Sequence, residues 1–213
     1  MVTFTNMLEG YRRFRATGWA NQRSRWDELA DGQSPRVMVI ACSDSRVDPA
    51  EIFDTNPGEI FVVRNVAALV PPFETAPGRH GVSAAVEFAV QVLGVEEILV
   101  MGHGLCGGCK AALTQELHDA PPGEGGFIAS WISMLDDARA QVVAEHGTDQ
   151  GRIAGRAMEQ AAVKVSLANL RSFPWIREKE AGNVLSLKGA FFAISDGVLH
   201  ILNEETGTFL PYE

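Results

Sequence analysis

Short apolar runs, separated by stretches in which apolar residues recur at helical spacing, constrain the fold of this chain more than any other feature. The apolar runs at residues 37–41, 60–63 and 98–101 each have the length and side chains of a strand that is buried on both faces, and the third predicted strand begins at Glu97. Such continuous runs are typical of parallel sheets, whose faces are covered by helices. Their alternation with helical stretches predicts an α/β fold with a mostly parallel central sheet and helices on both faces.

The remaining elements follow from the same spacing and from turn signals. Asp48 followed by Pro49 is typical of a helix start, and Asp196-Gly197 is typical of a hairpin. The last strands are therefore predicted to form a C-terminal antiparallel hairpin. The predicted helices cover residues 82–93, 106–117, 127–145 and 152–170, and the predicted C-terminal strands cover 184–187, 190–194 and 198–202.

The chain has 213 residues, enough for one well-buried domain. We expect a helical arm at residues 1–32 and a single α/β domain at 33–213. The formal net charge of −9 argues against nucleic acid or an anionic membrane as a partner. The sequence shows no signal-peptide pattern and no apolar run long enough to span a membrane, so we expect a cytoplasmic protein.

Two clusters of potential metal ligands follow two of the predicted strands. The sequence Cys-Ser-Asp-Ser-Arg occupies residues 42–46, and His-Gly-Leu-Cys-Gly-Gly-Cys occupies residues 103–109. Ligands in α/β proteins bind at the carboxyl ends of the strands, so Cys42, His103 and Cys106 are predicted to meet there. Two thiolates and one imidazole favour zinc, and three protein ligands leave a fourth position for water.

The spacing of the ligands leaves other interpretations open. Cys106 and Cys109 have the two-residue separation of a dithiol redox site. Cys109 could also complete a closed structural zinc site of four ligands. Asp44 and Arg46 favour a catalytic site, because a carboxylate near the metal can accept a hydrogen bond from bound hydroxide and a guanidinium can hold that carboxylate in place.

Four motifs together resemble the β-class carbonic anhydrases. They are the sequence at residues 42–46, Phe-Val-Val-Arg-Asn-Val-Ala at 61–67, Ser-Ala-Ala-Val-Glu-Phe-Ala at 83–89 and His-Gly-Leu-Cys-Gly-Gly at 103–108. The resemblance runs in order from about residue 33 to residue 113. It implies one Zn²⁺ per chain bound by Cys42, His103 and Cys106, with Asp44 and Arg46 as a catalytic dyad.

The same resemblance implies the reversible hydration of CO2 to bicarbonate and a proton, by attack of zinc-bound hydroxide. Substrate contacts are expected from one polar side chain, three apolar side chains and one backbone group: Gln33, Phe61, Val66, Phe88 and Gly107. The pocket of this family lies at a dimer interface, so the resemblance implies a homodimer or a dimer of dimers. An N-terminal helix of each chain is expected to pack around the neighbouring subunit. An enzyme that hydrolyses carbonyl sulfide or carbon disulfide would share every motif.

Four positions depart from patterns in the family. Val39 and Ala41 replace the tryptophan and glycine of members with a regulatory bicarbonate site, which predicts the non-allosteric type with Asp44 paired to Arg46. Phe88 replaces the tyrosine of plant-type members, so no hydroxyl is expected there. Cys109 replaces an aliphatic residue and is interpreted as a thiol that takes part in helix packing.

Overall fold

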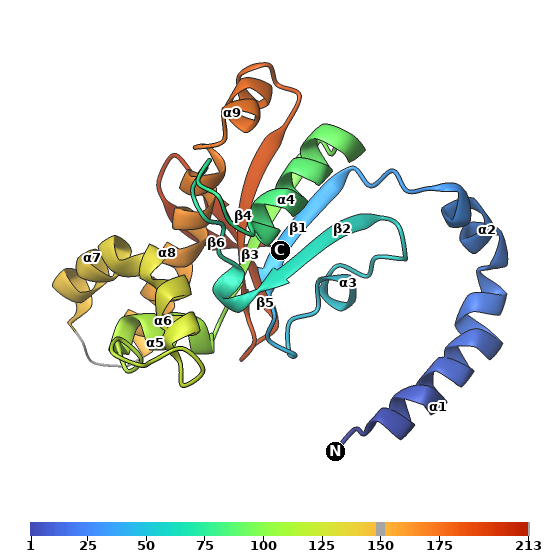
Figure 1. Cartoon of the computed structure of the whole chain (residues 1–213), viewed down its shortest axis with the longest axis horizontal. Coiled ribbons are helices and arrows are strands. Elements are labelled where there is room, and N and C mark those ends of the chain that lie inside the picture. Colours follow the sequence, from blue (N-terminus) through green and yellow to red (C-terminus); the bar gives the residue numbers. More distant parts are fainter. Residues whose placement is uncertain (148–151, 213) are drawn as a thin grey trace. The chain divides into compact units, whose positions relative to one another are not determined.

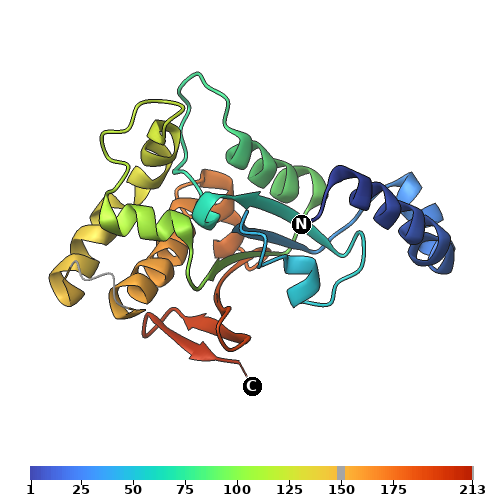
Figure 2. The same cartoon turned by 90° about the horizontal axis from the view of Figure 1, so that it is seen from below.

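Six strands form one sheet in the order β2-β1-β3-β4-β5-β6 (Figures 1 and 2). This computed structural model describes residues 1–147 and 152–212. β1 pairs in parallel with β2 and β3, β3 pairs in parallel with β4, and the last two pairings are antiparallel. The predicted fold class is therefore confirmed. The strands are β1 (Val37–Cys42), β2 (Ile60–Asn65), β3 (Glu97–His103), β4 (Ser186–Ala193), β5 (Val198–Asn203) and β6 (Thr208–Pro211).

The C-terminal strands differ from the sequence prediction in two respects. Residues 184–187 and 190–194 were predicted as separate strands, but one strand, β4, joins most of both because Lys188 and Gly189 continue the parallel pairing with β3. Gly189 allows close packing, since a Cβ there would lie 3.0 Å from both Leu167 and Leu202. β6 was not predicted, because a four-residue edge strand that ends in proline carries little periodicity.

Helices cover the two faces of the sheet unequally. Alternate residues of β1 point to opposite faces, and Met38 and Ile40 pack in a core cluster with residues of the helices that cover the first face. Val39 and Ala41 pack in another cluster, which includes residues of α3 (Pro49–Ile52). The first face is covered by α4 (Gly81–Glu87), the π-helical turn η3 (Phe88–Leu93), α8 (Arg152–Leu170) and α9 (Pro174–Ala181).

A third group of helices lies beyond the carboxyl edge of the sheet, next to α8 (Figure 1). The predicted helix at 127–145 is divided in two by a short 3-10 turn. The group comprises α5 (Gly107–Thr114), α6 (Gly126–Ile132), the 3-10 turn η4 (Ser133–Leu135) and α7 (Asp136–His146). A further 3-10 turn, η2 (Val66–Ala68), follows β2.

The chain divides into two compact units, Met1–Ser34 and Pro35–Glu213. The first unit contains α1 (Phe4–Phe14), the π-helical turn η1 (Arg15–Trp19) and α2 (Arg23–Asp31). The apolar side chains of α1 are solvent-exposed, from 43% at Phe14 to 73% at Phe4. Among the described residues, no helix combines the length and the apolar character needed to cross a bilayer.

Candidate metal centre

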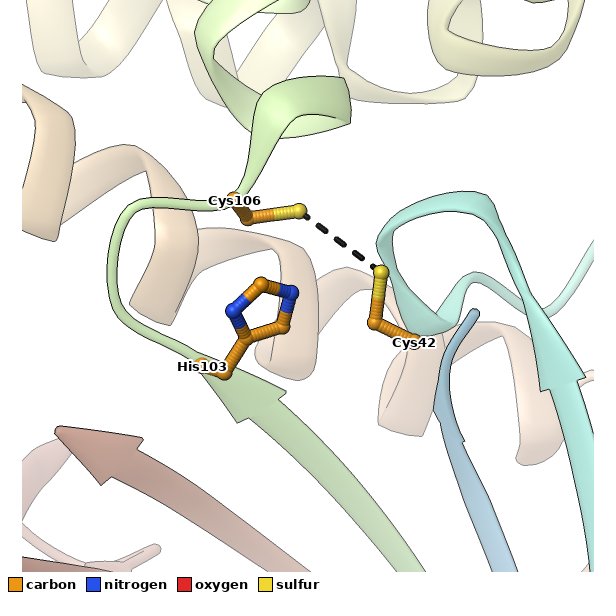
Figure 3. Close-up of side chains that lie close together, drawn as sticks. All are labelled: Cys42, His103 and Cys106. Atoms are coloured by element: carbon orange, nitrogen blue, oxygen red, sulfur yellow. Dashed lines mark hydrogen bonds between the residues drawn. The ribbon is translucent and has the colours of Figure 1, made fainter. Parts of the chain in front are cut away.

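Two neighbouring parallel strands and the start of a helix bring Cys42, His103 and Cys106 together. Cys42 ends β1, His103 ends β3, and Cys106 is the N-cap of α5. The three buried side chains point toward one another, and their ligand atoms all lie within 4.8 Å of one another (Figure 3). The predicted meeting of the two clusters is therefore confirmed, whereas the role of these residues as zinc ligands stays a prediction.

The distance between the two sulfur atoms fits a tetrahedral metal ion. Cys42 Sγ lies 3.9 Å from Cys106 Sγ, and both residues are free thiols. Two sulfur ligands of tetrahedral zinc, each about 2.3 Å from the ion, lie about 3.8 Å apart. A disulfide would need a separation of about 2.0 Å. The separation of the two sulfur atoms therefore fits two ligands of one metal ion and does not fit a disulfide.

His103 presents one ring nitrogen to the two sulfurs. Its Nδ1 lies 2.9 Å from the carbonyl oxygen of Gly104, whereas Nε2 is buried and has no hydrogen-bond partner among the described residues. A buried nitrogen without a partner is costly, and coordination of a metal would satisfy it. The bond at Nδ1 leaves the lone pair on Nε2, which is the usual arrangement of a zinc-binding histidine.

The third cysteine does not join this group. Cys109 is buried one turn into α5, but within the described part of the chain the set of converging ligands is Cys42, His103 and Cys106. The closed four-ligand site considered from the sequence is therefore not formed. A tetrahedral zinc ion with three protein ligands keeps its fourth position for water.

The thiols favour the protonated state in the protein without a cation. The neighbouring thiol of Cys109, together with burial, raises the pKa of Cys106 to about 12. Hydrogen bonding to Cys106, together with burial, raises the pKa of Cys42 to about 12. Zinc binds thiolates, so binding at neutral pH must displace the protons of both thiols.

Asp44 and Arg46 form a bidentate ion pair beside the ligands. Arg46 Nε donates to Asp44 Oδ1 at 2.9 Å, Arg46 Nη2 donates to Asp44 Oδ2 at 2.7 Å, and the backbone N–H of Arg46 donates to Oδ1 at 3.0 Å. These bonds hold the pKa of Asp44 well below its usual range, so the carboxylate stays ionised at neutral pH. The predicted pairing of Asp44 with Arg46 is confirmed.

Arg64 was not predicted to have a role, yet it holds the loop that follows Cys42. Its guanidinium donates to the carbonyl oxygens of Cys42 and Asp44 at 2.9 and 2.6 Å and to the carboxylate of Asp48 at 2.8 Å. Asp48 also caps α3 as predicted, because its Oδ1 accepts from the backbone N–H of Ala50 at 2.9 Å. The sequence did carry a signal for Arg64. It is a charged residue at the carboxyl end of one predicted strand, and Cys42 lies at the carboxyl end of the neighbouring strand.

Glu159 is a second residue whose role was missed. It lies on α8 with 8% of its surface exposed, and its Oε1 accepts from the backbone N–H of Cys106 at 3.1 Å. Burial raises the pKa of Glu159. The sequence carried a signal, since Glu159 interrupts the apolar face on which Ala154, Met158 and Ala162 recur.

Comparisons with known proteins agree with this site. Residues 37–199 match the sequence pattern of the carbonic anhydrase family, which covers most of the chain. The chain is 35% identical over 192 residues to beta carbonic anhydrase 3 of Arabidopsis thaliana, covering 90% of this chain and 74% of that protein. The chain belongs to the β-carbonic anhydrase family. It is also 36% identical to the chloroplastic beta carbonic anhydrase 5 of the same plant, of which it spans 62%.

Several solved β-carbonic anhydrases share the fold of this chain. The structure of CcaA has a TM-score of 0.89 to this chain at 29% identity, with 98% of each chain covered. One of two β-carbonic anhydrases from Sordaria macrospora, described as tetrameric, has a TM-score of 0.82 at 29% identity, covering 94% of this chain and 96% of that one. The likeness extends through the C-terminal hairpin, beyond the region that carried the sequence resemblance.

The residues predicted to line the substrate pocket fall into two groups within this β-carbonic anhydrase. Gly107 follows Cys106 directly, and Val66 lies close to the same turn, since its Cγ1 would be 2.7 Å from a Cβ placed on Gly108. Phe61 and Phe88 form a separate pair, with ring centroids 5.9 Å apart.

The aromatic pair lies away from the ligands of its own chain. Phe61 pairs with Met38, four residues before Cys42 on β1, which corresponds to about 13 Å along the strand. The structure therefore brings Val66 and Gly107 to the metal centre but leaves Phe61 and Phe88 apart from it within one chain. Gln33 belongs to the first unit, and its place in the pocket stays a prediction.

Proposed function

We propose that this β-carbonic anhydrase catalyses the reversible hydration of CO2 to bicarbonate and a proton, with one Zn²⁺ per chain. The observation that carries the proposal is the convergence of two thiols and one imidazole, all buried, at the carboxyl edge of a parallel sheet. Cys42, His103 and Cys106 would hold the ion. Zinc supplies the Lewis acidity that makes water a nucleophile near neutral pH.

Asp44 and Arg46 would orient the reacting water. The two donors of Arg46 fix the plane of the Asp44 carboxylate, and the ion pair keeps it charged, so an oxygen of Asp44 can accept the hydrogen bond that aims the nucleophile. A fixed acceptor lowers the entropy cost of reaching the reactive geometry. The backbone N–H groups at the start of α5, including that of Gly107, favour the developing negative charge of bicarbonate.

We infer that the CO2 pocket is completed between two chains. Val66 and Gly107 lie beside the metal centre of their own chain, whereas Phe61 and Phe88 lie about 13 Å along the strand from Cys42. A neighbouring subunit would supply the aromatic pair, and Gln33 would contact the substrate. A homodimer, or a dimer of dimers like the tetrameric relatives, satisfies this requirement.

The apolar face of α1 supports the same assembly. Phe4, Met7 and Tyr11 are each more than half exposed in the single chain, and burial of such side chains contributes about 1.5–3 kcal/mol each. Removal of residues 1–32 should therefore convert the dimer to a monomer in analytical ultracentrifugation. A cytoplasmic location is proposed for the assembled enzyme and can be checked by cell fractionation.

Zinc content and stopped-flow CO2 hydration, measured together, test the proposed activity. Cys42→Ala and His103→Ala should each lose both zinc and hydration, while Cys109→Ala should keep both. A metal-free variant that remains active would contradict the proposal. Parallel assays with carbonyl sulfide and carbon disulfide decide between the two substrate classes, because the site residues are the same for both.

A further inference from the structure

The turn that carries Cys106 has an unfavourable backbone conformation. Leu105, directly before Cys106, has a φ of 59°. This value lies in the left-handed region of backbone conformations, which residues other than glycine and asparagine rarely adopt. Such a residue persists only where its surroundings hold it in place. Leu105 itself is 66% exposed, so burial of its side chain does not supply this restraint.

The peptide bond between Leu105 and Cys106 is held at both ends. At one end, Arg46 Nη2 donates to the carbonyl oxygen of Leu105 at 3.1 Å. At the other end, the N–H of Cys106 donates to Glu159 Oε1 at 3.1 Å. The C=O and N–H of a trans peptide point in opposite directions, so Arg46 and Glu159 lie on opposite sides of this peptide and prevent it from rotating.

The bond from Arg46 has a charged donor and is therefore stronger than a bond between neutral groups. The guanidinium lies at the negative end of the peptide dipole, and the carboxyl group of Glu159 accepts at the positive end. Rotation of this peptide would change ψ of Leu105 and φ of Cys106, now −70°, and so the local backbone that carries the sulfur ligand. The two bonds thus hold the backbone of one ligand residue in place.

The packing of α8 against β3 explains how a carboxylate reaches this position. Gly102 precedes His103 on β3, and a Cβ there would lie only 2.6 Å from Cγ2 of Val163 and 3.4 Å from the carbonyl oxygen of Glu159. The absence of a side chain at Gly102 therefore lets α8 lie close enough for Glu159 to contact the turn. The carboxyl group of Glu159 is buried, which is costly unless a specific contact requires it.

We propose that Glu159 is a positioning residue for the metal ligand Cys106, acting with Arg46 through the peptide bond that joins Leu105 to Cys106. This inference rests on the proposed zinc site. Arg46 and Glu159 together form a clamp on this peptide. Because Arg46 also holds Asp44, the clamp links the proposed catalytic carboxylate to the residue that carries a ligand sulfur. Glu159 contacts neither substrate nor metal in this scheme.

The test measures the zinc dissociation constant of the full-length protein by competition with a chromophoric chelator. Glu159→Leu removes the acceptor and should weaken zinc binding by about 10- to 100-fold, the range found for supporting partners of metal ligands. Glu159→Gln keeps a neutral acceptor and should fall between Glu159→Leu and the wild type. Leu167→Ala is the matched control, because Leu167 is buried on the same helix but packs in the other core cluster. It should unfold more easily and bind zinc normally.

Cobalt substitution and a double-variant cycle provide independent measurements. In the Co²⁺-loaded protein, the sulfur-to-cobalt charge-transfer absorption should weaken in both Glu159 variants and stay unchanged in Leu167→Ala. Arg46→Gln combined with Glu159→Gln should weaken zinc binding by less than the product of the two single effects, because both residues hold one peptide.

The outcomes separate the clamp from the proposed function. Zinc affinities of both Glu159 variants within about twofold of the wild type, against the expected 10-fold or more, would overturn the clamp while leaving the zinc site intact. If Glu159→Leu fails to fold, Glu159→Gln and the cobalt spectrum still decide the question. Absence of zinc binding in the wild type would instead overturn the proposed function itself.

Discussion

Replacement of Arg64 tests whether a single side chain holds the loop between Cys42 and Asp48. Arg64→Met keeps most of the length of the side chain, which is 27% exposed, and removes the guanidinium. The strongest losses are the bonds to the carbonyl oxygens of Cys42 and Asp44, at 2.9 and 2.6 Å. At about 1.5 kcal/mol for each bond with a charged donor, these contribute about 3 kcal/mol.

The ion pair between Arg64 and Asp48 adds little to this sum. The Asp48 side chain is 48% exposed, so solvent screens the pair and its contribution stays below about 1 kcal/mol. The expected loss of about 3 kcal/mol corresponds to a fall in Tm of roughly 6–12 °C for a chain of this size. Urea unfolding of the zinc-loaded protein, followed by circular dichroism at fixed protein concentration, measures the change.

Two further variants make the result specific. Arg64→Lys can keep only one of the bonds, so it should recover about 1 kcal/mol of the loss. Arg177→Met removes an exposed arginine from α9 and should change the stability by less than about 0.5 kcal/mol. A loss below about 1 kcal/mol for Arg64→Met, with zinc affinity unchanged, would refute the assignment of Arg64 as the residue that holds the loop.

Three further predictions concern the site itself. Asp44→Asn should keep zinc, by elemental analysis, and lose about 10²- to 10⁴-fold in kcat/KM for CO2 hydration, whereas loss of zinc would make Asp44 a structural residue. Cys109→Ala should keep zinc and activity. Loss of activity with zinc retained would instead favour the interpretation of Cys106 and Cys109 as a dithiol redox site. Zinc binding should strengthen by up to about 100-fold per pH unit at mildly alkaline pH, since thiols whose pKa is raised to about 12 must each release a proton, and a pH-independent affinity would contradict this.

The first three strands and the meeting of Cys42, His103 and Cys106 could be predicted from the sequence because their signals are local. Residues 37–41 and 98–101 are continuous apolar runs, and a cluster of potential metal ligands begins within two residues of the end of each run. Parallel pairing then places Cys42 and His103 at the same edge, as the register of Ala41 with Met101 shows. The residues that hold these ligands could not be found in this way.

Glu159 and Leu105 show why the supporting contacts were missed. Glu159 lies 53 residues beyond Cys106, and nothing in the local sequence indicates which turn α8 will approach. The left-handed φ of Leu105 has no residue signature, because leucine normally avoids that region. β4 was divided in two by the prediction because Lys188 and Gly189 are poor strand formers, and the pairing with β3 overrides their preference.

The two sulfur ligands are separated by 64 residues, and Glu159 follows the second of them by another 53. A ribosome must therefore complete most of the chain before any segment can offer a finished pocket to an ion. Contacts between such distant segments also form slowly, because a long loop must close first. Metal should consequently enter a protein that has already folded, so loading at the end of refolding should restore activity as fully as loading from the start.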